Sequence, residues 1–314
     1  MSSPLSHLVH QGPVLRALGG ILFSSLPSSS AQSSRVAPAV PSGWIEAVLP
    51  PRPESLVRDY IRHVGGDPGW YRGVLPLHMF PQWSFPLLAR AVAGLPYPTT
   101  RIVNAGCWIE VRAPLPAGEP LHVKVRLESI HDDGRRALIV QRVVTGTAEQ
   151  PEAMTAELRA IVPLAARKPG AARPASAHHR VPLDAKEIAF LRLRGSAGRD
   201  FAALTGDVNP IHWFPPAARA AGFRGCILHG FSTLARTVEA LNRRVFAGDP
   251  RSLSSIDVRF VRPLVLPSSV GVYITRSSEA FVGDAPGGGA YLEGRFEAHG
   301  EPNGPNESGV SHHG

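Results

Sequence analysis

One pattern, a helix followed by alternating strands, occurs twice along this chain. Segments 88–95 and 234–241 share several identical positions, and their apolar residues recur every three or four residues, as in a buried helix. Segments 109–115 and 258–264 resemble each other in the same way and predict strands. A helix that is apolar on most sides must be covered, and a curved sheet can cover it. The repeat therefore predicts an α+β fold of two equivalent halves, each a long helix wrapped by a curved antiparallel β-sheet.

Other segments extend each repeat into a meander, because their alternating or β-branched residues are typical of strands. The predicted strands are 44–49, 121–127, 137–145, 156–162, 270–275 and 291–298. A further helix is predicted over 53–64, since proline suits its first turn and two glycines follow it. The glycines at 287–289 lie between predicted strands and do not match a dinucleotide-binding pattern, so they predict a loop.

Shifts in composition predict the boundaries of five parts. We expect an N-terminal extension over 1–43, a first half over 44–165, a linker over 166–182, a second half over 183–300 and a disordered tail over 301–314. The extension is rich in serine, proline and alanine around an apolar piece. It is therefore expected either to stay flexible or to dock on the body as an amphipathic segment.

Charge and cysteine usage limit the partners and the compartment. The net charge is +8, and the basic residues are almost all arginines, scattered without a basic helix or an aromatic-interleaved patch. This pattern argues against nucleic acid and fits a phosphorylated small molecule, an acidic carrier or a solvated surface. Cys107 and Cys226 have no metal-like spacing, which favours a cytoplasmic location. No apolar run approaches the roughly 18 residues that a membrane span needs.

The most informative stretch for function is a short polar turn in the second half. Asp207 and His212 are too far apart for one helical face, and Gly206 and Pro210 supply the turn that can bring them together. A carboxylate and an imidazole on one small loop can hold a water between them. Such a pair can add or remove water by general acid–base catalysis.

A second informative stretch, at the start of the later repeat helix, follows this turn. Gly230 begins that helix directly after His229. A glycine at a helix N-terminus offers an unpaired N–H and the positive end of the helix dipole. It could therefore bind an oxyanion, whereas His229 is expected to be structural.

Segments 201–212 and 220–230 together resemble the motif of the MaoC-type (R)-specific enoyl-CoA hydratases, whose hotdog fold wraps a sheet around a long helix. The resemblance covers 186–298 well. The first half resembles, more distantly, the degenerate N-terminal hotdog of two-domain hydratases and acyl dehydratases. A double hotdog fold is therefore implied.

The resemblance also implies roles for four residues. Asp207 and His212 would bind the water that adds to the β-carbon of a trans-2-enoyl thioester, and which of them is acid or base stays open. Asn209 would orient the loop or the water. Gly230 would donate its N–H to the thioester carbonyl and so stabilise the enolate-like oxygen of the transition state. Neither a cofactor nor a metal is implied.

Three further residues are candidates for substrate contact: Arg224, Phe231 and Trp213. The pair Arg243 and Arg244 is a candidate for CoA phosphates, with exposed surface arginines as the alternative. Phe214 stands where members of the family often carry an acidic residue or serine, which makes the rim of the site more apolar.

The first half lacks the catalytic loop. Its helix begins with the sequence 83–85 where the second half has 229–231, and no matching Asp-x-Asn-Pro-x-His precedes it. One active site per chain is therefore predicted. The first half is hypothesised to open a tunnel for the acyl chain.

The predicted function is a hydro-lyase of fatty acid metabolism. It would hydrate trans-2-enoyl-CoA or dehydrate (3R)-hydroxyacyl-CoA. One alternative is a dehydratase that acts on acyl carrier protein in fatty-acid or polyketide synthesis, because an acidic carrier suits the +8 charge. A second alternative is a non-catalytic acyl-thioester-binding protein, against which the intact Asp207, Asn209 and His212 set argues. A homodimer would fit the open edges of such sheets.

Overall fold

The computed structural model describes residues 4–11, 39–98, 102–164 and 179–300. The expected tail and most of the expected linker and N-terminal extension lie outside these ranges. The helices and 3-10 turns that the text uses are η1 (Pro4–Gln11), α2 (Glu54–His63), α3 (Pro68–Tyr71), η2 (Leu77–Met79), α4 (Pro81–Val92), α5 (Ala197–Thr205), η4 (Pro210–His212), α6 (Pro215–Ala220) and α7 (Gly230–Arg244).

Ten strands form one antiparallel sheet in the order β1-β3-β4-β5-β2-β7-β10-β9-β8-β6. The strands are β1 (Ile45–Leu49), β2 (Val103–Val111), β3 (Leu121–Asp132), β4 (Arg136–Gly146), β5 (Met154–Pro163), β6 (Lys186–Leu193), β7 (Leu253–Phe260), β8 (Ser268–Ile274), β9 (Glu279–Gly283) and β10 (Ala290–Ala298). The two repeat-related segments become β2 and β7, which pair at the centre of the sheet with Ile109 opposite Ile256. The predicted α+β class with a large antiparallel sheet is confirmed.

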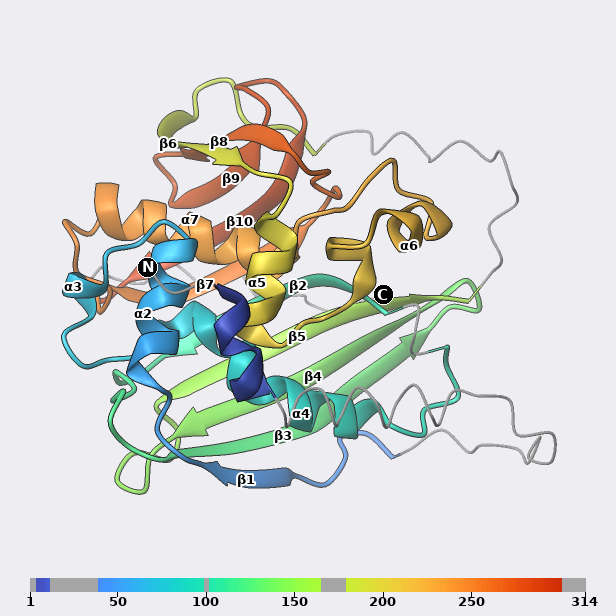
Figure 1. Cartoon of the computed structure of the whole chain (residues 1–314), viewed down its shortest axis with the longest axis vertical. Helices are drawn as coiled ribbons and strands as arrows, with labels where there is room; N and C mark the ends of the chain where they lie inside the picture. The colour runs from blue at the N-terminus through green and yellow to red at the C-terminus, as the bar shows by residue number, and fades with distance from the viewer. Residues whose placement is uncertain (1–3, 12–38, 99–101, 165–178, 301–314) are drawn as a thin grey trace, which may run out of the picture.

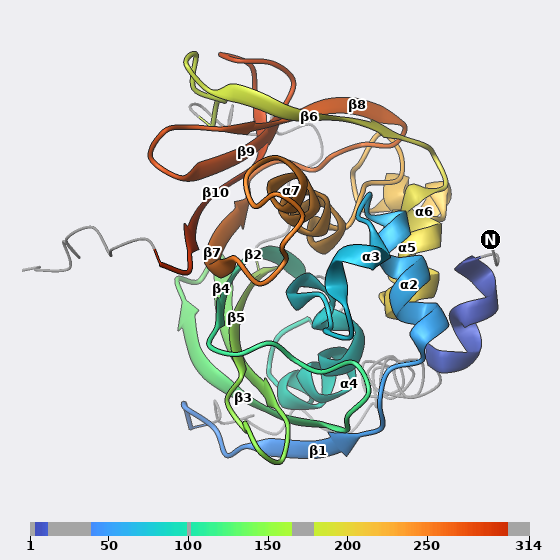
Figure 2. The same ribbon diagram turned by 90° about the vertical axis from the view of Figure 1, so that its left-hand side faces the viewer.

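The two long helices contact largely different parts of the sheet. Helix α4 contacts β1, β3 and β4, whereas α7 contacts β6, β9 and β10 and also β2 of the first half. Figure 2 shows α4 beside the green strands of the first half and α7 beside the red and yellow strands of the second. Buried side chains of both halves, among them Trp83, Ile109, Phe231 and Leu234, join in one hydrophobic core.

The boundaries differ from the sequence prediction where glycine and proline intervene. Helix α4 begins before the repeated segment and ends at Val92, because Gly94 has a φ of +83° and Pro96 follows. Strand β2 likewise ends at Val111, before Pro114. The predicted loop at 287–289 is confirmed, since it connects β9 to β10.

Two strands escaped the sequence analysis. In β6 the apolar residues Ile188 to Leu191 are consecutive, so the spacing does not separate a strand from a helix. Strand β9 spans only five residues. Both strands become recognisable only through their pairing with β8.

Part of the N-terminal extension docks on the body. The 3-10 turn η1 packs against α5, and His7 Nε2 lies 3.0 Å from Asp59 Oδ2 of α2. Figure 1 shows η1 in dark blue beside α5. The extension was expected either to stay flexible or to dock on the body, and its described residues 4–11 fit docking.

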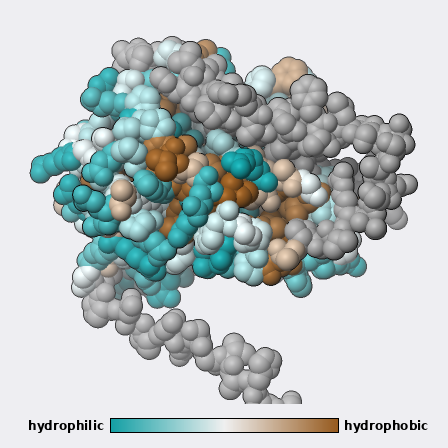
Figure 3. All heavy atoms as spheres, turned by 90° about the horizontal axis from the view of Figure 1, so that it is seen from below, coloured by the Kyte–Doolittle hydropathy of each residue, from teal (hydrophilic) through white to brown (hydrophobic). Residues whose placement is uncertain are grey.

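Many arginines of the basic surface are paired with carboxylates. Arg126 binds Glu128, and Arg262 binds Asp284 with 2.6 Å between Nη2 and Oδ2. The face of the molecule seen from below mixes hydrophilic residues with smaller hydrophobic patches (Figure 3). In the part of the chain that the structure describes, no helix is both long enough and apolar enough to cross a membrane.

A buried polar network ties α7 to the first half. Glu239 of α7 accepts a hydrogen bond from the hydroxyl of Tyr71 at 2.6 Å and lies 3.2 Å from His78 Nε2. Its other carboxylate oxygen accepts from Asn242 Nδ2 at 3.3 Å. All four side chains are buried. Gly66 leaves room for this carboxylate, since a Cβ there would overlap it.

Candidate active site

The turn predicted between Asp207 and His212 follows helix α5 directly. Gly206 caps α5 in the left-handed region, with a φ of +82°, and so redirects the chain. Asn209 then caps the short turn η4, because its Oδ1 accepts a hydrogen bond from the Ile211 amide at 3.3 Å. Glycine and asparagine chemistry thus places the carboxylate and the imidazole on one compact loop.

His212 is held as a neutral acceptor. Its side chain is buried, and its Nδ1–H donates to the carbonyl of Ile227 at 2.8 Å. The remaining lone pair is therefore on Nε2. Burial lowers the pKa of this imidazole from its ordinary value, and the nearby Asp207 carboxylate opposes that shift. A neutral imidazole with a free Nε2 can accept a proton from water.

Asp207 has the opposite tendency. Burial raises the pKa of its carboxyl, while the charge of His212 and the backbone N–H of Asn209 oppose the rise. The side chain keeps 17 % of its surface exposed, so it is reachable from outside. Burial thus raises the pKa of the carboxyl and lowers that of the imidazole, which brings the proton affinities of the two groups closer together and favours proton transfer between them. Asn209 contributes two hydrogen bonds to this loop, and its role in supporting catalysis stays a prediction.

His229 contacts both members of this pair. Its ring stacks on His212 with 3.6 Å between centroids, and its Nε2 donates to the backbone carbonyl of Asp207 at 3.0 Å. Phe201 supports the ring from another side at 4.9 Å. Burial and then the charge of His212 lower its pKa well below the ordinary value. From sequence alone His229 was expected to be structural, and only its position before Gly230 pointed to these contacts.

Asp207, His212 and His229 each offer one ligand atom within 4.8 Å of the others. A metal ion binds in the plane of an imidazole ring, and the two rings here are stacked at 25°. This geometry suits proton transfer better than a shared metal.

Gly230 is the first residue of α7, and among the described residues its amide has no hydrogen-bond partner within the protein. The ring of Phe260 lies so close that a Cβ at Gly230 would come within 2.5 Å of it. Glycine is therefore required for packing, and the bare backbone leaves the N–H approachable. This N–H and the helix dipole together provide a donor for an anionic oxygen.

The three predicted substrate contacts have different surroundings. Phe231 is buried between Phe80 and Phe260, at 5.7 and 5.8 Å between ring centroids, so we correct its assignment from substrate contact to core packing. Trp213 is 44 % exposed beside His212, and its Nε1 donates to the carbonyl of Val208. Arg224 is exposed on the segment between α6 and α7. Both stay predictions.

The candidate phosphate ligands lie at the other end of α7. Arg243 donates to the carbonyl of Gly65 and stacks over Trp70, and Arg244 is exposed. A CoA site at these arginines remains a prediction.

In the first half, Ser84 occupies the place that corresponds to Gly230, and it is fully buried. That each chain has a single active site remains a prediction as well.

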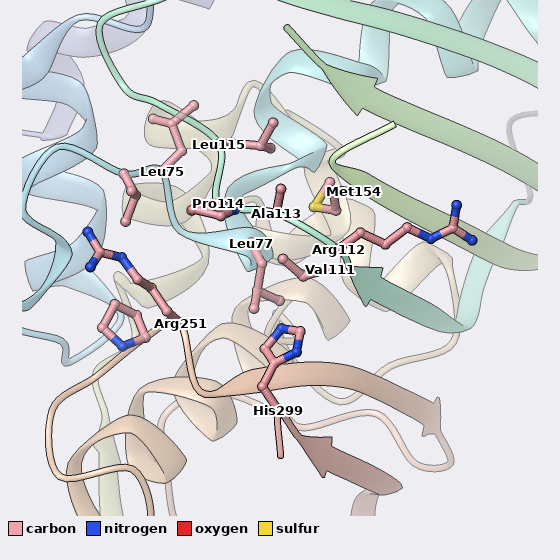
Figure 4. A pocket seen from close by; sticks show the side chains of 12 residues that line it. Leu75, Leu77, Val111, Arg112, Ala113, Pro114, Leu115, Met154, Arg251 and His299 are labelled. Carbon is pink, nitrogen blue, oxygen red and sulfur yellow. The ribbon is translucent and has the colours of Figure 1, made fainter. Parts of the chain in front are cut away.

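A cavity of about 170 Å³ lies away from this site, at the junction of the two halves. Figure 4 shows Leu77, Met154, Arg251 and His299 around it. Arg251 follows the C-terminus of α7, whereas the acid–base loop contacts the N-terminus of that helix. The cavity includes none of the predicted site residues, so it does not support the tunnel hypothesis.

The buried imidazoles predict a loss of stability in acid. The pKa of His63 is lowered to about 4 by burial and then by Arg236, and the pKa values of His212 and His229 are lowered too. As the pH falls from about 6.5 toward 4, the unfolded chain protonates these groups before the folded chain does. The free energy of unfolding should therefore fall by up to about 1.4 kcal/mol per pH unit for each imidazole. The raised pKa of Asp207 acts in the opposite direction, as a single group.

Urea unfolding at pH 7 and pH 5 measures this effect, with His63→Gln as the comparison. The variant should lose less stability than the wild type over this interval, because it lacks one of the depressed imidazoles. Equal losses in both proteins would contradict the assignment.

The part of the chain that contains this loop resembles known proteins. Residues 179–284 match the family model described as MaoC like domain. The 3-hydroxyacyl-thioester dehydratase X of Mycobacterium tuberculosis is 27% identical over 195 residues, which are 61% of this chain and 66% of that protein. The peroxisomal enoyl-CoA hydratase 2 of Arabidopsis thaliana is 43% identical over 58 residues, 18% of this chain and 19% of that protein. These alignments thus span less than two thirds of the relatives' own length.

Solved structures show a shared fold. HtdX of Mycobacterium tuberculosis superposes with a TM-score of 0.66 at 22% identity, over 82% of this chain and 100% of that chain. A conserved hypothetical protein of the same organism, described as a double hotdog fold, has a TM-score of 0.51 at 13% identity, over 83% of this chain and 96% of that chain. The chain therefore has hotdog-fold neighbours.

Proposed function

We propose that this chain, whose residues 179–284 match the family model described as MaoC like domain, is a hydro-lyase that adds water to trans-2-enoyl thioesters or removes it from (3R)-hydroxyacyl thioesters. The observation that carries the proposal is the meeting of an acid–base pair with a free helix N-terminus. His229 bridges the two, since it stacks on His212 and directly precedes Gly230. The names of the relatives, dehydratases and hydratases, support the same reaction class.

In the proposed mechanism the Gly230 N–H binds the thioester carbonyl oxygen. His212 Nε2 takes a proton from the water while the water oxygen bonds to the β-carbon. The electron pair of the double bond moves through the α-carbon toward the carbonyl, whose oxygen becomes enolate-like and is stabilised by Gly230. Asp207 then donates its proton to the α-carbon. A proton passed from the imidazolium of His212 to the carboxylate of Asp207 restores the starting state, and dehydration runs through the same steps in reverse.

The finer architecture belongs to the same proposal. Residues 44–165 and 183–300 would each be a hotdog unit, with α4 and α7 as the wrapped helices. The contacts of α4 with β1 and β3, and of α7 with β6 and β10, support this division, as does the central pairing of β2 with β7. The degenerate first unit would serve as the partner that covers α7.

The thioester carrier and the assembly are further parts of the proposal. Coenzyme A is the expected carrier, with acyl carrier protein as the alternative, and the net charge of +8 suits either anionic partner. Strands β1 and β6 end the sheet, and Val48 and Phe190 on them are 63 % and 53 % exposed. A homodimer could cover such an edge.

The test of the reaction class is a hydration assay with purified protein and trans-2-enoyl-CoA thioesters of several chain lengths. The proposal expects the absorbance of the conjugated thioester to fall as water adds. The same acyl chain on carrier protein, measured over a range of concentrations, separates the two carriers. Binding of these thioesters without turnover on either carrier would leave the acyl-thioester-binding alternative and end the hydro-lyase proposal.

His229 would act as a positioning residue for the pair. We expect His229→Phe to lower kcat by about 10-fold to 100-fold with little change in KM, because the ring still packs but no longer donates to the Asp207 carbonyl. His229→Gln, which retains a side-chain N–H donor, should recover part of the loss. Steady-state kinetics of the two variants check this expectation, and a wild-type kcat in His229→Phe would contradict it.

A further inference from the structure

Buried polar side-chain atoms without a hydrogen-bond partner lie along α7, from the residue before Gly230 to Arg236. Among the described residues, six buried side-chain atoms lack a hydrogen-bond partner. Three of them are His229 Nδ1, Ser232 Oγ and Arg236 Nε, which recur at three- and four-residue spacing and so share one helix face. Buried polar groups are nearly always paired, so a row of unpaired ones points to a bound polar molecule.

Arg236 is the unusual member of this row. Its only side-chain hydrogen bond within the described residues joins Nη2 to Nε2 of His63 at 3.3 Å, and it forms no salt bridge there. His63 cannot neutralise it, because an imidazole is either neutral or positively charged, and burial and then Arg236 lower the pKa of His63 to about 4. Burial likewise lowers the pKa of Arg236 to about 10. A guanidinium held in such a place without a counter-ion is costly, and the anionic group of a ligand would offset that cost.

The neighbouring carboxylates are already engaged. Glu239, one turn further along α7, binds Tyr71, His78 and Asn242 through both oxygens. Asp200 of α5 acts electrostatically on His63 and binds Arg199. Neither carboxylate pairs with Arg236. Among the described residues the Arg236 guanidinium is therefore left without a carboxylate partner.

The position of Arg236 relative to Gly230 identifies the part of the ligand that carries the charge. Six residues of α7 separate them, about 9 Å along the helix axis. Helical side chains lean toward the N-terminus, which brings the guanidinium closer to Gly230. The rings of His63, Phe201 and His229 contact one another in series from Arg236 toward Gly230, with centroids 6.3 Å apart for His63 and Phe201 and 4.9 Å apart for Phe201 and His229. The largely buried position suits the end of a short acyl chain better than the phosphates of a large carrier.

We propose that the preferred acyl group ends in a second carboxylate, which Arg236 binds while Gly230 binds the thioester carbonyl. The inference rests on the proposed function, whose substrate class it narrows to monothioesters of short unsaturated dicarboxylic acids. The planar guanidinium can bind both oxygens of a carboxylate. Ser232, between the two ends, offers a hydroxyl to the same ligand.

Binding of unreactive saturated thioesters tests the inference without turnover. Glutaryl-CoA and pentanoyl-CoA have the same chain length and differ in a terminal carboxylate against a methyl group. Calorimetry on the wild type should give at least about 10-fold tighter binding of glutaryl-CoA, and Arg236→Gln should abolish that preference. Arg295→Gln, at an exposed arginine on β10 that is given no role in the site, should retain it. Equal binding of both thioesters by the wild type, or a preference that survives in Arg236→Gln, would overturn the inference.

Turnover separates this inference from the proposed reaction. The unsaturated counterparts, glutaconyl-CoA and 2-pentenoyl-CoA, should differ in kcat/KM in the wild type, and Arg236→Lys should retain part of the preference. Asp207→Asn should lose turnover of both thioesters and still bind glutaryl-CoA more tightly. A protein that binds glutaryl-CoA selectively but hydrates neither thioester would refute the hydratase function alone. A protein that hydrates both equally would refute the dicarboxylate preference alone.

Discussion

Asp207→Asn is expected to lower kcat for hydration by about 10²-fold to 10⁴-fold, because an amide cannot donate the proton that the α-carbon needs. The free energy of unfolding should change little, since burial already disfavours the charged carboxylate at this position. Steady-state hydration of a trans-2-enoyl-CoA and urea unfolding measure the two quantities on the same preparation.

The matched control is Asp200→Asn, the same substitution on α5, where the carboxylate binds Arg199. Its kcat should stay within about threefold of the wild type. His212→Gln should show a loss similar to that of Asp207→Asn, because glutamine cannot accept the proton of water at neutral pH. A kcat near that of the wild type in either Asp207→Asn or His212→Gln would show that the pair does not carry the chemistry.

Glu239→Ala is expected to lower the free energy of unfolding by about 3–5 kcal/mol. The substitution leaves the Tyr71 hydroxyl, His78 Nε2 and the Asn242 amide without their shared acceptor inside the core. Because the network joins α7 to the first half, the substitution weakens the packing of the two halves against each other. Urea unfolding followed by circular dichroism checks this expectation.

Glu239→Gln separates the loss of hydrogen bonds from the loss of volume. Glutamine keeps one oxygen for Tyr71 but replaces the oxygen that Asn242 uses, so its loss should be intermediate. A stability of Glu239→Ala equal to that of the wild type would mean that the network does not hold the halves together.

Local chemistry made much of this molecule predictable from sequence. The strands with clear alternation were found within a few residues, because a half-buried sheet imposes that period. The compact loop at Asp207 and His212 could be foreseen as well, since Gly206 and Pro210 favour a turn through their own backbone geometry. The start of α7 at Gly230 followed from the same kind of local signal.

The rest depended on contacts between distant segments. The hydrogen bond from His212 to the Ile227 carbonyl involves a backbone group, and a backbone acceptor leaves no mark in a sequence. Phe231 was a candidate for substrate contact, but the partners that make it a core residue, Phe80 and Phe260, come from other parts of the chain. The unpaired state of Arg236 is likewise visible only once α2 and α7 lie together.

The configuration of the hydration product tests the central claim most directly, that this loop and Gly230 add water to one face of an enoyl thioester. Wild-type protein, incubated with a trans-2-enoyl-CoA and then analysed by chiral separation of the released 3-hydroxy acid, should give almost entirely the 3R product. The same incubation with Asp207→Asn should give almost none. A 3S or racemic product, or a 3R product that persists in Asp207→Asn, would contradict the account.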